Sequence, residues 1–141
     1  MRDVRFLLWL FESRDNQRES EAVLRLLLEA LTAANVVYLQ FHPKTPKIYQ
    51  SGVRYDEERA ECRTCPIPED WKSIPYVIHD GEGDCEDLAC WRAAELLLAG
   101  EQAQPTFTHR LIGNKLLYHI LVRRADGTIE DPSARLGMNS R

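Results

Sequence analysis

The sequence is poor in the features that mark a disulfide-held, nucleic-acid-binding or membrane protein. Four cysteines in 141 residues are too few to hold a domain of this size together by disulfides. Eighteen Lys and Arg stand against 22 Asp and Glu, and the net charge of -4 leaves no strongly basic surface for a nucleic acid. No apolar run reaches the roughly 18 residues of a membrane span. We therefore expect neither a nucleic-acid nor a membrane partner.

A secretion signal is also lacking, because no small-residue cleavage site follows the apolar stretch over residues 4–11. This absence predicts a cytoplasm-like compartment, in which reduced cysteines can act as nucleophiles or metal ligands. Hydrophobic residues make up 44% of the chain and charged residues 28%, which is typical of a globular protein with a real core. At this length a single domain over residues 1–141 is expected.

The first third of the chain predicts one long helix between two extended segments. Residues 4–11 are apolar on both faces and fit a buried strand or a short buried helix. An apolar stripe predicts a helix from about Ser20 to Ala34, with Asn35 at its end. The β-branched and aromatic stretch from Val36 to Phe41 favours a strand.

The rest of the chain predicts an irregular segment, a second helix and a β meander. Residues 43–75 contain five prolines, which favours irregular structure with a short strand near Ile48 to Val53. A helix is predicted from about Asp84 to Ala99, and Gly100 stops it. Turn dipeptides then separate three predicted antiparallel strands, Thr106–Ile112, Lys115–Arg124 and Thr128–Asp131. Together these elements predict the α+β class.

Cys85 is the cysteine whose position favours chemistry. It is expected in the first turn of the second helix, where Asp84 is a natural N-cap and Asp87 completes a capping box. The helix dipole favours a thiolate there, whereas Glu86 and Asp87 oppose it by like charge. A cationic partner is therefore needed if Cys85 is a nucleophile. Cys90, in the middle of the same helix, is expected to be a small buried core residue.

Three blocks resemble the transglutaminase-like superfamily of cysteine peptidases and acyltransferases, which carries a papain-like Cys-His-Asp triad. The family's nucleophile helix is similar to Gly83-Asp84-Cys85-Glu86-Asp87-Leu88-Ala89, followed by Leu96-Leu97-Leu98-Ala99-Gly100. Its His and Asp strands are similar to Tyr118-His119-Ile120-Leu121-Val122 and Ile129-Glu130-Asp131-Pro132-Ser133, in the same order. The resemblance covers about residues 80–138. It implies an α+β fold in which the nucleophile, at a helix N-terminus, packs on an antiparallel β meander.

The resemblance implies a catalytic triad of Cys85, His119 and Asp131. Elementary chemistry fits these roles, because an adjacent imidazole can take the proton of a weakly nucleophilic thiol. A carboxylate then orients the imidazole and stabilises its positive charge. Taken alone, His119 could equally be a core histidine within a strand, so the three residues must be judged together.

The turn before Asp131 decides whether this carboxylate can reach His119. A two-residue loop, Asp126-Gly127, pairs Val122 with Asp131 and places Asp131 on the face opposite His119. A three-residue loop that includes Ala125 shifts the register by one and places both side chains on the same face. The sequence allows both loops, and catalysis requires the second.

Other residues are candidates for supporting roles. The backbone N–H of Cys85 is one expected oxyanion donor, and the resemblance to papain-like proteins suggests His79 as a second. Trp71 and Gly83 are candidates for substrate contact, although a loop aromatic such as Trp71 can equally be tucked onto the core. Cys62 and Cys65 form a lone CxxC, for which zinc, a redox pair or disulfide, and no special role all stay open.

These observations predict a cysteine peptidase or transglutaminase-like acyltransferase that acts on a protein or peptide amide and needs no cofactor. Cross-linking by transfer to an amine is a variant of the same chemistry. Two non-enzymatic alternatives are an inactive transglutaminase-like fold used as a binding or assembly module, and a metal-stabilised binding protein built on Cys62 and Cys65. Small members of the superfamily occur in bacteria and phages, which suggests the cytoplasm of a bacterium or host cell, or a virion. The oligomeric state cannot be predicted from the sequence.

Overall fold

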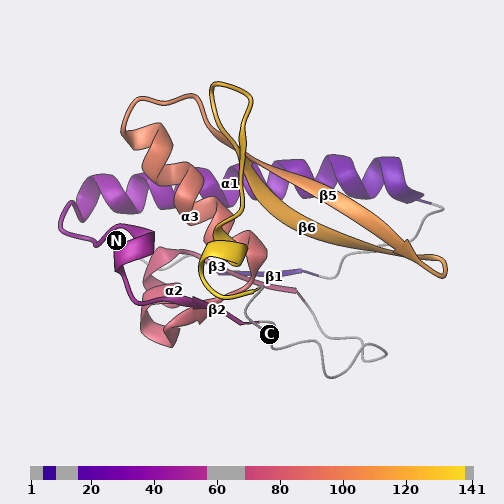
Figure 1. Ribbon diagram of the computed structural model, residues 1–141, viewed down its shortest axis with the longest axis horizontal. Coiled ribbons are helices and arrows are strands. Elements are labelled where there is room, and N and C mark those ends of the chain that lie inside the picture. The colour runs from indigo at the N-terminus through magenta and orange to yellow at the C-terminus, as the bar shows by residue number, and fades with distance from the viewer. Residues whose placement is uncertain (1–4, 9–15, 57–68, 139–141) are drawn as a thin grey trace.

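The computed structural model describes residues 5–8, 16–56 and 69–138, which form both helices and strands (Figure 1). The first elements are β1 (Arg5–Leu8), α1 (Gln17–Phe41), the 3-10 helix η2 (Ile48–Gln50), β2 (Arg54–Tyr55), β3 (Glu69–Lys72), α2 (Ile74–Asp80) and β4 (Glu82–Gly83). They are followed by α3 (Cys85–Leu98), β5 (Gln104–Ile112), β6 (Lys115–Arg123), β7 (Ile129–Glu130) and α4 (Pro132–Arg135). Helices and strands share the chain without a βαβ repeat, so the predicted α+β class is confirmed.

Helix α1 is longer than predicted, and the strand expected from Val36 to Phe41 is its last part. Buried side chains recur at helical spacing through the whole element, at Leu24, Leu28, Leu31, Asn35 and Leu39. This burial outweighs the β propensity of the final residues, because packing decides where propensity is weak. Asn35 does not end the helix, since its side-chain oxygen accepts a hydrogen bond from the Ile74 N–H at 3.0 Å.

Because α1 is longer than predicted, it contains a longer apolar stretch than expected from the sequence. Helix α1 is long and apolar enough to cross a membrane, by length and composition alone, and a third of its most apolar stretch is buried. A core helix of a soluble protein passes the same test. This stretch was not predicted as a possible membrane span because a few polar residues interrupt its run of apolar residues.

Helix α3 follows the prediction closely and forms the centre of the fold. The capping box between Asp84 and Asp87 is present, and Gly100 adopts a positive φ of 93° just past the C-terminal end. The helix packs against α1 and against β6. One core cluster contains α1, α3 and β6 side chains, and a second joins α3 to η2 and α2. Cys90 lies in the first cluster, as predicted.

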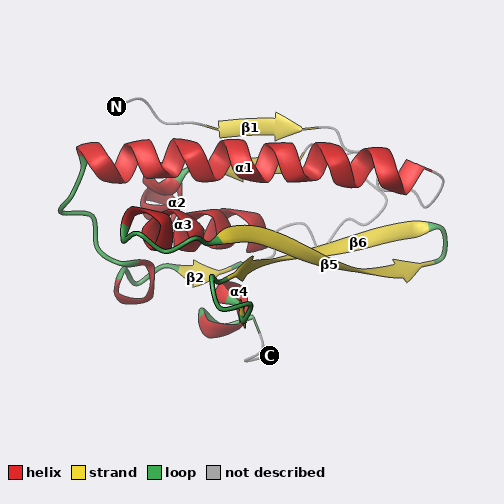
Figure 2. Ribbon diagram, turned by 90° about the horizontal axis from the view of Figure 1, so that it is seen from above, coloured by secondary structure: helices red, strands yellow, loops and turns green. Residues whose placement is uncertain are grey.

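Strands β5, β6 and β7 form the predicted antiparallel meander, with β6 in the middle. Strands β5 and β6 pair over their whole length around a turn at Gly113-Asn114 and extend as an arm beside α1 (Figures 1 and 2). Strand β7 is shorter than predicted, since only Ile129 and Glu130 pair with β6. The chain therefore leaves the sheet just before Asp131.

The segment over residues 43–75 holds more structure than expected. In place of a strand near Ile48 to Val53, the chain forms η2 and then the short strand β2, which pairs in parallel with β4. Strand β3 pairs antiparallel with β1 and brings Trp71 into the first core cluster. The rest of this segment, with Cys62 and Cys65, lies outside the described residues.

Candidate active site

Cys85 is the first residue of α3 and lies where this helix meets β6. Its side chain is partly buried and packs against the core cluster that contains Ile120. The backbone of Ile120 forms a hydrogen bond with the Cys85 sulfur. Because Ile120 directly follows His119, this contact places the sulfur beside the histidine's stretch of β6.

The turn between β6 and β7 has the three-residue register that catalysis requires. Val122 pairs with Glu130 in β7, and the Arg124 N–H donates to the Thr128 carbonyl at 2.8 Å across the turn. Gly127 adopts a positive φ of 87°, which explains why a glycine suits this position. Continued by one residue, this register places Asp131 on the same sheet face as His119.

The two side chains are in contact. His119 Nε2 lies 2.9 Å from Asp131 Oδ2, and both side chains are partly exposed. Because a carboxylate only accepts, Nε2 carries the proton in a neutral ring, and Nδ1 is then the basic nitrogen. The arrangement of imidazole and carboxylate is the one that a His-Asp pair needs for proton transfer.

Asp131 is held by the chain around it. Its second oxygen, Oδ1, accepts the Ala134 N–H at 3.2 Å, so Asp131 is the N-cap of α4. Pro132 fills the first helical position, which favours the start of a helix. The carboxylate therefore uses one oxygen for the cap and the other for His119, and its orientation is set from both sides.

The Cys85 thiol does not bond to His119 in this structure. Its Sγ donates to Glu86 Oε2 at 3.4 Å. Burial raises the pKa of the Cys85 thiol well above its usual value, and the negative charges of Glu86 and Asp84 add to this, against the opposing Ile120 hydrogen bond. The expected thiolate is therefore not favoured in the resting state, because burial and like charge outweigh the helix dipole.

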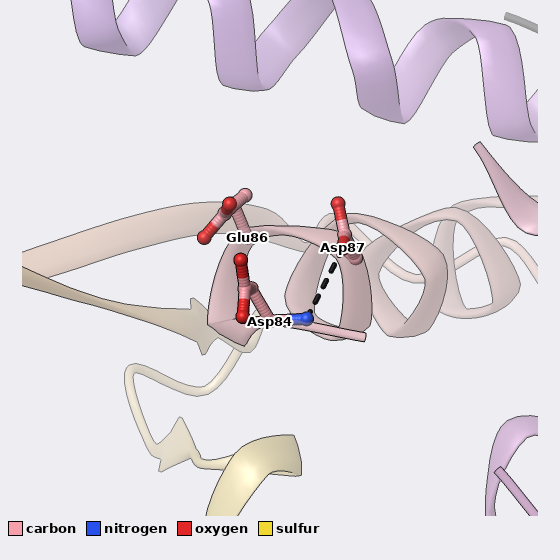
Figure 3. Close-up of side chains that lie close together, drawn as sticks. All are labelled: Asp84, Glu86 and Asp87. Atoms are coloured by element: carbon pink, nitrogen blue, oxygen red, sulfur yellow. Dashed lines mark hydrogen bonds between the residues drawn. The ribbon is translucent and has the colours of Figure 1, made fainter. Parts of the chain in front are cut away.

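Three carboxylates surround the start of α3. One carboxylate oxygen from each of Asp84, Glu86 and Asp87 lies within 4.8 Å of the other two (Figure 3). Asp87 is fully buried and accepts the Lys72 N–H at 2.7 Å and the Asp84 N–H at 3.1 Å. Burial raises the pKa of Asp87 to about 8. These contacts tie β3 to the first turn of α3, so at least one member of this cluster has a structural role.

Two residues predicted to contact substrate are instead part of the core. Trp71 is only 2% exposed and packs in the first core cluster, so of the two predicted alternatives the structure has the core position. Gly83 is buried against α3, where an added Cβ would lie 3.1 Å from the Asp87 Cβ. A glycine is needed there so that β4 can approach α3 closely.

His79, the second oxyanion candidate, lies at the end of α2. Its ring is 86% exposed and contacts the adjacent Asp80, with 3.2 Å between Nδ1 and Oδ1. Cys90 is also distinct from the site. Its thiol donates to the Leu28 carbonyl at 3.5 Å in the core, and burial raises its pKa.

A charged network that was not predicted from the sequence lies beside the site. Glu130 accepts hydrogen bonds from the Tyr49 hydroxyl and from Arg92 Nε, the latter at 2.6 Å. Arg124 Nη1 lies 3.3 Å from the same carboxylate and Arg135 Nη1 3.9 Å. Glu130 directly precedes Asp131, so this network fixes β7 and α4 to α3. Its only sequence signal was the position of Glu130 next to a candidate catalytic residue.

No protein-family model, curated protein or solved structure matches the chain.

Proposed function

We propose that this protein catalyses cysteine-dependent acyl transfer from a protein or peptide amide, with water as the favoured acceptor. The observation that carries the proposal is the contact between His119 and Asp131, in the one turn register that permits it. The placement of Cys85 at the start of α3, bonded to the backbone next to His119, supports it further. We also propose that the protein is a transglutaminase-like enzyme and that it acts in the cytoplasm, as the resemblance suggests.

The proposed reaction uses each of the three residues in a separate role. His119 Nδ1 takes the Cys85 proton, and the thiolate attacks the amide carbon to form a tetrahedral intermediate. The C–N bond breaks as His119 returns that proton to the leaving amine, which leaves a thioester on Cys85. Water, deprotonated by His119, then splits the thioester into the acid and the thiol. Asp131 stabilises the imidazolium in both halves.

The first turn of α3 supplies the group best suited to stabilise the oxyanion. The leading backbone N–H groups of a helix have no acceptor within the helix, and that of Cys85 lies next to its own nucleophile. In this scheme transfer to an amine instead of water would give cross-linking. No metal or organic cofactor is required for either outcome.

A second candidate, an inactive scaffold used for binding, is favoured by one observation. The Cys85 thiol donates to Glu86, and burial with the charges of Glu86 and Asp84 raises its pKa. For catalysis the thiol must leave this hydrogen bond and give its proton to His119. In a scaffold it would simply stay protonated.

Acylation by p-nitrophenyl acetate, an activated ester, separates the two candidates. An enzyme should release p-nitrophenol in a burst and gain one acetyl group, located on Cys85 by mass spectrometry. His119→Ala should abolish the burst, and Cys90→Ala should preserve it. If the wild type and His119→Ala acylate at the same slow rate, Cys85 is an ordinary thiol and the scaffold is the better description.

A further inference from the structure

Helix α1 has two apolar faces, and within the described part of the chain only one of them is buried. The inner face packs against α3, whereas the outer face carries a stripe of Val23, Leu26, Ala30, Ala33, Val37 and Phe41. All six residues are exposed, with Leu26 at 66% and Phe41 at 73%. Figure 2 looks onto α1 along its whole length. We call these six residues the outer stripe.

The spacing of the outer stripe is that of a helix-pairing seam. Successive members lie three, four, three, four and four residues apart, which is close to the alternation that keeps one seam facing a partner helix. The stripe spans about 27 Å at 1.5 Å per residue. A continuous exposed apolar surface of this kind marks an interaction site in a soluble protein.

The stripe is complementary to itself when two copies run antiparallel. With the two-fold axis between Ala30 and Ala33, each of these small residues faces the other in the second copy, which allows the helix backbones to approach closely. The next layer then places Leu26 opposite Val37, and Phe41 lies opposite Ala22, a small and exposed residue. A two-fold pair repeats each of these contacts twice.

The charges at the helix ends select the antiparallel arrangement. Exposed Glu19 lies in the first turn of α1, and exposed Lys44 follows its C-terminal end. An antiparallel pair brings the end of α1 that carries Glu19 against the end of the partner helix that is followed by Lys44, once at each end. A parallel pair would instead bring Glu19 against Glu19 and Lys44 against Lys44. Opposite charges at both ends also favour the correct register.

We propose that the outer stripe of α1 is the interface of a two-fold symmetric homodimer, in which the two α1 helices pack antiparallel. The occupant is a second copy of this chain because size and charge are both complementary under the same two-fold register. This inference is independent of the catalytic proposal, and its test uses no activity measurement.

The test measures the mass of the full-length protein in solution by sedimentation over a range of concentrations. The wild type should sediment as a dimer. Ala30→Glu should raise the dimer dissociation constant by about a hundredfold, because an unpaired carboxylate is then buried against an apolar surface. Gln102→Glu adds the same charge at an exposed site outside α1 and should leave the dimer intact. Circular dichroism should show that all variants keep the wild-type helix content.

The register is tested by mixing two variants that are each monomeric. Ala33→Lys alone should dissociate the dimer as Ala30→Glu does. Mixed in equal amounts, the two variants should form a heterodimer, because residue 30 of one chain faces residue 33 of the other. A monomeric wild type, a dimer insensitive to Ala30→Glu, or binding of a monomer to phosphatidylcholine vesicles would each overturn the proposal. Failure of the two variants to associate would overturn the antiparallel register.

Discussion

Largely buried carboxylates lie beside α3 at two places, one among other acidic side chains and the other among arginines. At the start of the helix, Asp87 is held by backbone N–H groups and has two acidic neighbours, and burial raises its pKa to about 8. On the other side, burial would raise the pKa of Glu130, but hydrogen bonds from Arg92 and Tyr49 lower it below its usual value. We call these regions the acidic end and the arginine network.

The difference separates a region arranged for a fixed structure from one that can exchange protons. A buried carboxylate paired with guanidinium groups stays ionised and holds its elements together. At the acidic end, burial instead raises the pKa of Asp87 to about 8, and shifts of this kind concentrate at functional sites. Cys85 lies at the acidic end, while Asp131 directly follows the arginine network. The candidate site therefore combines a thiol that lies among carboxylates with a carboxylate, Asp131, that is held from both sides.

The largest expected effect is on Asp131, which joins the two regions. Asp131→Asn keeps an oxygen for the Ala134 N–H and removes the charge that stabilises the His119 imidazolium. Acylation of Cys85 by p-nitrophenyl acetate should fall by about 10⁴-fold, as in the best-studied triad. Thermal unfolding should change little, and Asp126→Asn in the exposed turn serves as control. A variant that acylates at the wild-type rate would show that this pair is structural.

Trp71→Ala tests whether packing of β3 stabilises the acidic end. Trp71 is buried in the core, and the next residue, Lys72, supplies an N–H to Asp87. Loss of this side chain should lower the free energy of unfolding by about 4 kcal/mol, measured by urea denaturation. A variant of unchanged stability with reduced acylation would instead support a substrate contact.

Arg92→Met tests the arginine network. The substitution keeps much of the side-chain volume but leaves Glu130 with fewer charged partners in a largely buried position. We expect a loss of about 3 kcal/mol in the free energy of unfolding. Arg123→Met, at an exposed position of the same sheet, should cost far less. Equal effects of the two variants would contradict a special role for the network.

The two regions should respond to pH with opposite signs. Asp87 has a folded-state pKa of about 8 against a usual 3.8, so the folded state holds its proton more tightly. Its contribution to stability is therefore lost as pH rises between these values, by at most about 1.4 kcal/mol per pH unit. The lowered pKa of Glu130 gives stability above its usual 4.5 that is lost as pH falls below it.

Urea denaturation between about pH 2 and pH 9 separates these two contributions. Asp87→Asn should remove part of the decline in stability on the alkaline side, and Arg92→Met should weaken the decline on the acid side. If Asp87→Asn leaves the alkaline-side decline unchanged and Arg92→Met leaves the acid-side decline unchanged, then the two regions do not set the pH dependence of the free energy of unfolding.

Glu86→Gln is expected to have the smallest effect of the series. It removes a negative charge that raises the pKa of Cys85, so this pKa should fall. Iodoacetamide should then alkylate Cys85 up to about tenfold faster at neutral pH, because the thiolate reacts. Glu82→Gln is the matched control. A slower reaction would show that Glu86 assists the thiol, by accepting its proton, and does not restrain it.

Local patterns explain which parts of this architecture could be predicted. The second helix, its capping box, the glycine after it and the β5–β6 turn are set by contacts between residues close in sequence. The end of α1 was predicted wrongly because burial of Leu39 and the Asn35–Ile74 hydrogen bond involve residues distant in sequence. Trp71 could not be assigned for the same reason.

The sequence alone determined the α+β class, the position of Cys85 at a helix N-terminus and the order of the three candidate catalytic residues. Only the tertiary structure decided the turn register that joins His119 to Asp131, because both loop lengths satisfy the local sequence. It also decided that Cys85 rests against Glu86, and that Trp71 and Gly83 belong to the core. The physical reason is that burial and charge pairing act between segments far apart in the chain, where sequence periodicity carries no information.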